Sequence, residues 1–140
     1  FNTPYGHNKR TVFCDETEIR KAAKLLKTSQ IMCADYHEVM MEYAKEGDLV
    51  FLDPPYVPIS EYSDFKRYTK EQFGEEEQRR LAEDVKTLHK RGCYVMLTNS
   101  NHPLVHELFA DYKMEIFETK RMINKDGNKR TGEDVIVTTY

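Results

Sequence analysis

A run of four apolar residues leads directly into an acidic, proline-rich turn near the middle of the chain. Residues 49–52 are Leu-Val-Phe-Leu, and residues 53–56 are Asp-Pro-Pro-Tyr. A strand with apolar side chains on both faces is typical of the centre of a sheet that helices cover on each side. The run therefore predicts a central strand over residues 48–53 in an α/β protein.

Helical and strand patterns alternate along most of the chain. Acidic residues at the start, lysines near the end and an apolar stripe predict a helix over residues 16–27. Because the last two strands have no helix between them, we expect a mainly parallel sheet with an antiparallel C-terminal hairpin. The other expected strands are at 31–34, 93–98, 113–120 and 135–139. The other expected helices are one through Val39 and Ala44 that Gly47 ends, one after the capping pair Thr69 and Gln72 that Gly92 ends, and a short one from Pro103.

Composition is compatible with one folded domain. The chain has 140 residues, of which 39% are hydrophobic, and this is adequate for a single core. The net charge of -3, from 21 basic and 24 acidic residues, neither demands nor forbids a polyanionic partner, so any nucleic-acid surface must be local. We see no signal peptide and no run of 18 apolar residues. We therefore expect a cytoplasmic monomer without a membrane anchor.

Cysteine and histidine spacings give no metal-site pattern. Cys14, Cys33 and Cys93 are far apart and form no CxxC motif, which argues against a disulfide framework and a zinc site and favours buried free thiols. His102 and His106 have the i, i+4 spacing of a helix, but no third ligand lies near them in the sequence. We assign no metal.

The turn after the predicted central strand is the strongest candidate for a functional site. In an open α/β sheet, ligands bind outside the carboxyl ends of the strands. The carboxylate of Asp53 beside the aromatic face of Tyr56 suits a flat base that bears an exocyclic amine. The alternative is structural, because Asp-Pro is a common turn start. Asn99 and Ser100 leave the neighbouring strand, where they shape the pocket or, as we prefer, cap the helix from Pro103.

The turn resembles the catalytic Asp-Pro-Pro-Tyr motif of the S-adenosylmethionine-dependent amino-methyltransferases. Further stretches resemble the Dam-type DNA adenine methyltransferases, which modify adenine within GATC. They occur in order along essentially the whole chain, and their joint occurrence makes the resemblance specific. These stretches are Phe1-Asn2-Thr3-Pro4-Tyr5-Gly6, Ala34-Asp35-Tyr36, Gly47 to Tyr56 with Val57-Pro58, Arg91-Gly92 to Asn99-Ser100, and Arg121-Met122-Ile123-Asn124 to Val137-Thr138-Thr139-Tyr140.

The resemblance implies methyl transfer from S-adenosylmethionine to N6 of an adenine flipped out of double-stranded DNA. The adenine amine is a poor nucleophile because its lone pair is delocalised into the ring. The Asp53 carboxylate and the Pro54 carbonyl would each accept one amino hydrogen and aim the lone pair at the methyl group, and the fixed negative charge would stabilise the transition state. Stacking on Tyr56, worth roughly 1–3 kcal/mol, would offset much of the cost of flipping.

The resemblance also implies a cofactor site and an incomplete domain. Asp35 and Tyr36 would lie near the adenosine part of the methyl donor, together with Asp53. The glycine-rich loop that holds the methionine part of the donor is absent from these residues. We therefore expect the C-terminal portion of one catalytic domain. Residues 1–14 would end the DNA-recognition region, residues 15–140 would form the core, and a missing N-terminal part would be needed for activity.

Residues for DNA contacts come from three parts of the chain. The segment from Val57 to Tyr68 is long and rich in aromatic residues, as functional lids often are. Basic residues around the terminal hairpin would track phosphates, although lysines on an edge strand also serve to discourage aggregation. The expected contacts are Pro4 to a base edge, Lys9 to a phosphate, Phe65 or Tyr68 to the flipped base or the space it leaves, and Lys120 and Arg121 to phosphates.

Two alternatives remain beside DNA adenine methylation. Related enzymes methylate RNA or a protein glutamine, but those groups usually carry Asn at the position of Asp53. A non-catalytic remnant would keep the fold without the cofactor loop. The sequence leaves the recognition site and the biological role open, whether repair, regulation, restriction or a phage function.

Overall fold

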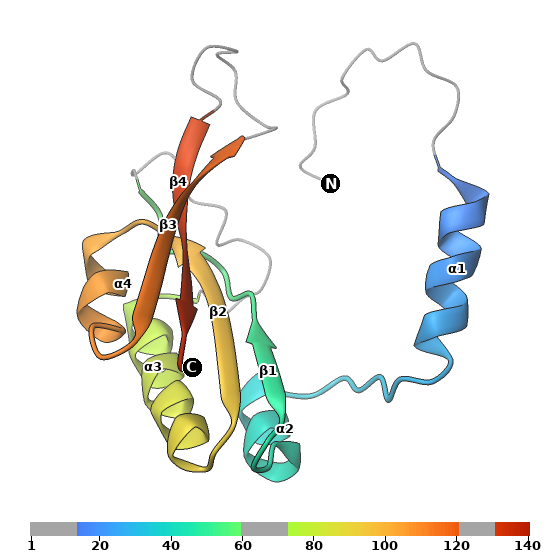
Figure 1. Cartoon of the computed structure of the whole chain (residues 1–140), viewed down its shortest axis with the longest axis horizontal. Helices are drawn as coiled ribbons and strands as arrows, with labels where there is room; N and C mark the ends of the chain where they lie inside the picture. Colours follow the sequence, from blue (N-terminus) through green and yellow to red (C-terminus); the bar gives the residue numbers. More distant parts are fainter. Residues whose placement is uncertain (1–13, 60–72, 121–130) are drawn as a thin grey trace. The chain divides into compact units, whose positions relative to one another are not determined.

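The computed structural model describes residues 14–59, 73–120 and 131–140. The chain divides into two compact units, residues 1–34 and residues 35–140. Figure 1 shows the elements of each unit in sequence colours. The predicted capping pair Thr69 and Gln72 lies outside the described residues.

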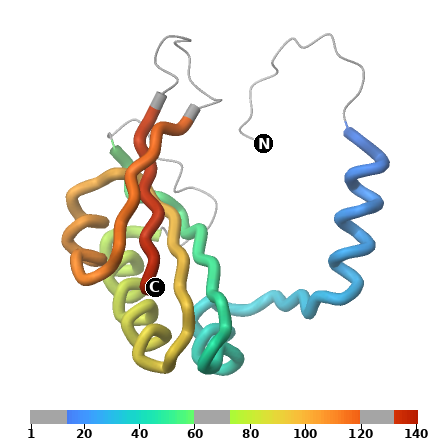
Figure 2. The backbone as a smooth tube through the Cα atoms, in the orientation of Figure 1, coloured from blue at the N-terminus to red at the C-terminus, as the bar shows by residue number. Residues whose placement is uncertain are grey.

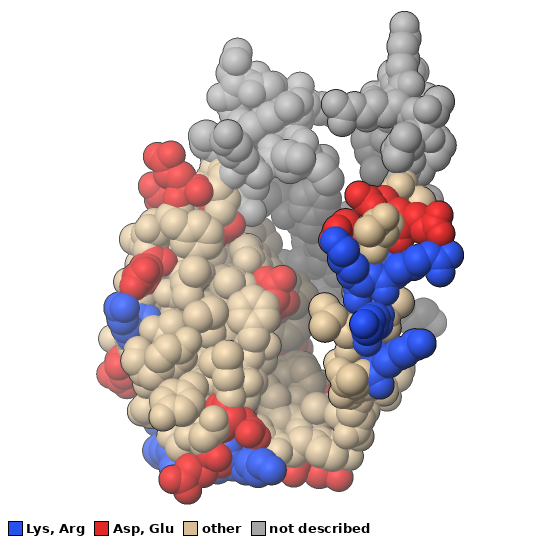
Figure 3. Space-filling view, turned by 45° about the vertical axis from the view of Figure 1, so that its right-hand side comes forward, with Lys and Arg blue, Asp and Glu red and all other residues tan. Residues whose placement is uncertain are grey.

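The first unit contains helix α1, Glu16–Leu26, which confirms the predicted helix to within one residue. The Asp15 carboxylate accepts hydrogen bonds from the backbone N–H groups of Thr17 and Glu18, at 3.0 and 3.2 Å, as an N-cap should. Acidic side chains at the start and basic side chains beyond them follow the helix dipole, and Figure 3 shows both groups along this helix. No residue of α1 is buried.

The strand predicted at residues 31–34 is wrong. This segment has no regular structure, and Ile31 is 74% exposed. An apolar run becomes a strand only where a neighbouring strand pairs with it, and no described strand does so here. Cys14 and Cys33 are exposed free thiols, contrary to expectation, whereas Cys93 is buried as expected.

The second unit is built on a four-stranded sheet in the order β1-β2-β4-β3. Its strands are β1 Leu49–Leu52, β2 Tyr94–Ser100, β3 Lys113–Lys120 and β4 Thr131–Thr138. Strands β1 and β2 are parallel, and β4 runs antiparallel to both β2 and β3. The backbone tube in Figure 2 shows β4 between its two neighbours. The terminal hairpin is confirmed. Strands β1, β2 and β3 run in the same direction, and only β4, which returns between β2 and β3, runs against them.

Three helices complete the second unit: α2 Tyr36–Tyr43, α3 Glu75–Lys90 and α4 Pro103–Leu108. Helix α3 connects β1 to β2 and begins at Gly74, whose N–H donates to Glu77 Oε2 at 2.7 Å. Gly92, with φ +87°, follows its end as predicted. Gly47 does not end α2, because the backbone of Ala44 is already extended. Gly47 instead forms the turn before β1.

Among the described residues of the second unit, helices pack against one face of the sheet. On that face, Val95, Leu97, Val135 and Val137 form a core with residues of α3 and α4. The other face, which carries Leu49, Phe51 and Tyr94 and is called the open face below, has no described helix of this unit against it. Leu49 and Phe51 are 64% and 59% exposed, and β1 is an edge strand. The predicted central strand covered on both sides is therefore wrong for the described residues, because apolar composition does not identify what covers each face.

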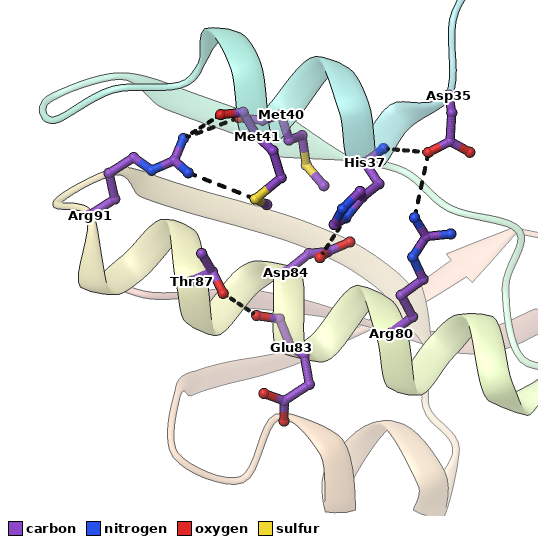
Figure 4. Close-up of polar contacts among 9 residues, drawn as sticks. All are labelled: Asp35, His37, Met40, Met41, Arg80, Glu83, Asp84, Thr87 and Arg91. Atoms are coloured by element: carbon purple, nitrogen blue, oxygen red, sulfur yellow. Dashed lines mark hydrogen bonds and ion pairs between the residues drawn. The ribbon is translucent and has the colours of Figure 1, made fainter.

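Side-chain contacts fix α2 against α3 and against Arg91 at the end of α3, as Figure 4 shows. His37 Nδ1 lies 2.8 Å from Asp84 Oδ1. Arg91 Nη1 donates to the carbonyls of Met41 and Ala44, at 3.0 and 2.7 Å, and so satisfies the end of α2. These contacts place the start of α2 beside the carboxyl end of β1. Within the ranges that the structure describes, no helix is long and apolar enough to cross a membrane.

Candidate functional site

A hollow of ≈ 300 Å³ lies at the carboxyl end of β1. Its volume is at the lower end of the range for small-molecule sites, about 300–1,000 Å³. Most of its lining is apolar or aromatic, with one carboxylate among it. Three predicted site residues meet here, one from the cofactor set and two from the catalytic turn. The lining residues are Tyr36, Phe51, Leu52, Asp53, Pro54, Pro55, Phe73 and Leu81.

The Asp53 carboxylate is exposed at this hollow and accepts a hydrogen bond from the neighbouring strand. Thr98 Oγ1 donates to Asp53 Oδ1 at 2.6 Å. No described residue forms an ion pair with this carboxylate. Because side chains alternate along a strand, Thr98 shares the open face with Tyr94. The carboxylate is therefore oriented by a neutral donor and keeps its charge available to a ligand.

Tyr56 lies beside the same carboxylate, but it is not among the residues that line the hollow. Its half-buried phenol interacts with the side chains of Thr98 and Asp53. Burial raises the pKa of Tyr56 above its usual value, the hydrogen bond to Thr98 lowers it, and the negative charges of Asp53 and Asp134 raise it further. The phenol is therefore neutral at physiological pH and can donate a hydrogen bond.

Tyr36 lines the hollow, and Asp35 supports the helix behind it. The Asp35 carboxylate accepts a hydrogen bond from His37 N at 3.0 Å and caps α2. The Tyr36 ring centroid is 6.2 Å from that of Phe73, and the Arg80 guanidinium lies 5.9 Å from the Tyr36 centroid. The buried Tyr36 hydroxyl has no hydrogen-bond partner among the described residues. Burial raises the pKa of Tyr36, and the nearby Asp84 carboxylate raises it further.

Asn99 and Ser100 contact the turn itself, contrary to our preferred interpretation that they cap α4. His102 caps that helix, because its Nδ1 accepts from Leu104 N at 3.1 Å. Asn99 Oδ1 instead accepts from Val57 N at 3.0 Å, and Ser100 Oγ donates to Val57 O at 2.6 Å. The sequence feature that marks this role is that two polar residues, Asn99 and Ser100, continue an apolar strand.

Gln78 and Thr98 were not among the predicted site residues. Gln78 lies on α3, one turn before the core residue Leu81, and is buried like it. A polar residue at the helical spacing of an apolar stripe marks such a position. Thr98 carried no comparable signal, because its contact with Asp53 depends on how β1 and β2 pair.

The predicted DNA contacts stay predictions. Five of the predicted contacts lie outside the described residues: Pro4, Lys9, Phe65, Tyr68 and Arg121. The sixth, Lys120, is the last residue of β3. Among the residues with described positions, no group of three or more His, Cys, Asp or Glu residues is placed to hold a metal ion.

Comparison with known proteins gives one family. The family model described as D12 class N6 adenine-specific DNA methyltransferase matches residues 1–123. Type II methyltransferase M.MjaIII of Methanocaldococcus jannaschii is 40% identical over 131 residues, which cover 93% of this chain and 45% of that protein.

Two other relatives are matched over similar shares of this chain and of their own length. Type II methyltransferase M1.LlaDCHI of Lactococcus lactis subsp. cremoris is 38% identical over 143 residues, with 100% of this chain and 50% of that protein covered. The DNA adenine methylase of Escherichia coli (strain K12) is 29% identical over 140 residues, again with 100% and 50% covered. The chain thus spans about half the length of the curated relatives it matches.

Proposed function

The chain belongs to the family of D12 class N6 adenine-specific DNA methyltransferases, and on that basis we propose that the protein methylates N6 of an adenine flipped out of duplex DNA. One observation carries the proposal beyond the family. The Asp53 carboxylate is exposed at a mostly apolar hollow, oriented by Thr98 and paired with no cation among the described residues. This is the environment that an acceptor for an exocyclic amine requires.

Three residues of the turn have separate roles in this proposal. Asp53 accepts one amino hydrogen, and the backbone carbonyl of Pro54 accepts the other, so the lone pair of the nitrogen is directed away from both. As the amine gains positive charge, the fixed carboxylate stabilises the transition state. The phenol of Tyr56 stacks on the base, and stacking of this kind is worth roughly 1–3 kcal/mol.

The hollow also fits part of the methyl donor. S-adenosylmethionine supplies an electrophilic methyl group when bound. Tyr36 and Phe73 present aromatic surface to the hollow, and the buried Tyr36 hydroxyl has no described partner, so these side chains suit a flat, polar-edged group such as adenosine. Asp35 holds the start of the helix that carries Tyr36. In this proposal the donor lies on the Tyr36 side and the target base on the Asp53 side.

We propose further that other segments of the same protein complete the domain. The open face exposes Leu49 and Phe51, and the relatives are about twice as long as this chain. An N-terminal part with the glycine-rich loop would cover this face and hold the rest of the donor. GATC as the target, a monomeric state and a cytoplasmic location remain parts of the proposal that rest on the resemblance.

The test uses the whole protein that contains this chain. It is incubated with a labelled methyl donor and an adenine-containing duplex, and the products are digested to nucleosides and identified by mass spectrometry. We expect N6-methyladenine. Asp53→Ala should lower kcat by about 10²–10³-fold, the usual effect of removing one electrostatic contact to a transition state.

The matched control is an exposed aspartate away from the hollow. Asp111→Ala makes on the surface the same change that Asp53→Ala makes at the site, and it should leave kcat unchanged. Full activity of Asp53→Ala would exclude the mechanism. Parallel reactions with RNA and with a glutamine-containing protein separate the alternative substrates, because methylation of either one alone would replace DNA in the proposal.

A further inference from the structure

A buried polar network lies beneath the turn, at the carboxyl end of β2. Gln78, Asn99 and Ser100 are 2%, 0% and 1% exposed. Buried amides are costly unless they are hydrogen-bonded, and these are bonded to one another and to the turn. Gln78 Nε2 donates to the Pro55 carbonyl at 2.8 Å, and Asn99 Nδ2 donates to Gln78 Oε1 at 3.1 Å.

The network holds the backbone on both sides of Tyr56. Before it, the Pro55 carbonyl is bound by Gln78. After it, the N–H of Val57 donates to Asn99 Oδ1 at 3.0 Å, and the carbonyl of Val57 accepts from Ser100 Oγ at 2.6 Å. These contacts come from α3 and from the end of β2, two elements anchored in the core.

The direction of the hydrogen bonds in this network is fixed by its two ends. The Val57 N–H can only donate, so Asn99 must turn its oxygen toward it and its NH₂ group toward Gln78. The Pro55 carbonyl can only accept, so Gln78 must turn its NH₂ group toward that carbonyl. Each amide therefore has one orientation that satisfies all partners, and an apolar side chain at position 78 would remove the partner of the buried Asn99 amide and of the Pro55 carbonyl.

Two consecutive prolines make such anchoring necessary. Pro54 and Pro55 have no backbone N–H, so this part of the turn can be tied down only through its carbonyls. The Pro55 carbonyl is occupied by Gln78, whereas the Pro54 carbonyl accepts no hydrogen bond from a described residue. The Pro55 carbonyl is thus anchored to the core, and the Pro54 carbonyl stays available to accept a hydrogen bond from a ligand.

We infer that Gln78, Asn99 and Ser100 are positioning residues for the methyl transfer, because they hold the backbone of Pro55 and Val57 and thereby fix Asp53 and the Pro54 carbonyl at the hollow. The inference rests on the proposed function. Strand β2 acts on the turn from both faces of the sheet. Thr98 orients the Asp53 side chain on the open face, and Asn99 holds the backbone on the opposite face.

The test compares Gln78→Met with Leu88→Met in the whole protein. Gln78→Met keeps the length of the side chain and removes both hydrogen bonds. Leu88→Met perturbs packing at another fully buried position of the same helix, away from the hollow. We expect kcat to fall about 10- to 100-fold in Gln78→Met, because small misplacements of reacting groups have effects of this size. KM for DNA should stay near the wild-type value, and Leu88→Met should keep the wild-type kcat.

A second readout reports the anchor itself. Amide hydrogen exchange at Val57, measured by NMR, should accelerate at least about tenfold in Gln78→Met and in Ser100→Ala, relative to core amides of β2 in the same sample. A purely structural role predicts equal acceleration at all of these amides. Ser100→Ala removes only one hydroxyl, so it supplies the test if Gln78→Met does not fold.

The outcomes separate this inference from the proposed function. If wild-type protein methylates DNA and Gln78→Met or Ser100→Ala has a wild-type kcat, the inference is wrong and the proposed function stands. If wild-type protein does not methylate DNA, the proposed function fails, and exchange at Val57 alone decides whether the network anchors the turn. Unchanged exchange at Val57 in a folded variant overturns the inference in either case.

Discussion

The Thr98 hydroxyl lies 2.6 Å from Asp53 Oδ1. Thr98 belongs to β2 and Asp53 directly follows the parallel strand β1, so a side chain of one strand orients the carboxylate at the end of the other. The pairing of Leu52 with Leu97 brings the next residue of each strand side by side. Because side chains alternate along each strand, both side chains lie on the open face. The orientation of Asp53 therefore depends on strand register as much as on the turn.

Replacing Thr98 with Val should lower kcat of the whole protein about tenfold. The change keeps the branched shape and removes the donor. A hydrogen bond to a charged group is worth about 1.5–3 kcal/mol, and the exposed carboxylate places this one at the lower end. Thr98→Ser keeps the hydroxyl and should retain most activity. Equal rates for Thr98→Val and the wild type would show that the hydrogen bond does not orient Asp53 during the reaction.

Stability should fall at alkaline pH, partly through Tyr56. Burial raises the pKa of its phenol above the usual value of about 10. Between the unfolded and the folded pKa, the unfolded chain loses a proton that the folded chain keeps, so the contribution of Tyr56 is complete below about pH 10 and is lost as pH rises through the folded pKa. Burial also raises the pKa of Tyr36 and Tyr112.

Urea unfolding between about pH 9 and pH 11.5 measures this effect. In Tyr56→Phe the free energy of unfolding should decline less steeply with pH than in the wild type. Tyr36, Tyr112 and the Cys93 thiol, whose pKa burial also raises, contribute to the decline that remains. Identical slopes in the two proteins would mean that the folded environment does not raise the pKa of Tyr56.

Gly47 and Gly92 form a matched pair for backbone strain. Their φ angles are +86° and +87°, but a Cβ at position 92 would lie 2.9 Å from Glu46 Cγ, whereas a Cβ at position 47 would have no atom within 4 Å. Gly47→Ala should lower the free energy of unfolding by about 1–2 kcal/mol, the cost of a left-handed residue with a side chain. Gly92→Ala should lower it further.

Adding Glu46→Ala removes the clashing atom. In that background the cost of Gly92→Ala, measured by urea unfolding, should fall to that of Gly47→Ala. If Gly47→Ala and Gly92→Ala lower the free energy of unfolding equally while Glu46 is present, contact with Glu46 plays no part.

Removing the partner of a buried carboxylate should also destabilise the second unit. His37 Nδ1 contacts Asp84 Oδ1 at 2.8 Å, and Asp84 Oδ2 is buried with no partner among the described residues. His37→Ala should lower the free energy of unfolding by about 1–3 kcal/mol, because it leaves Asp84 without this contact. Glu83→Ala, at the exposed position next to Asp84, should have little effect. In an Asp84→Ala background, His37→Ala should lower the free energy of unfolding much less than it does in the wild type.

Local signals predicted the helices, but not the partners of the strands. Asp15 and the acidic first turn are sufficient to place α1, and Pro103 is sufficient to place α4. The segment at 31–34 has the same apolar character as β1, but only β1 has a neighbour to pair with. Whether an apolar run forms a strand, and which face is covered, depends on residues far away in the sequence.

The same distinction applies to the candidate site. Asp53 and Pro54 were predicted because a local motif carries them, and the structure places both at the hollow. Gln78 and Thr98 were missed because their contacts span separations of 23 and 45 residues. Such contacts follow from the packing of α3 and the register of β2, which no short motif records.

Strand β4 lies between β2 and β3, although it follows both of them in the sequence. Until residues 131–138 have been synthesised, β3 has no partner in the sheet, and Val95 and Leu97 of β2 lack Val135 and Val137 beside them. Folding of this unit therefore cannot be completed before β4 has been synthesised. A truncation that removed β4 would leave the facing edges of β2 and β3 unpaired and open to aggregation and proteolysis.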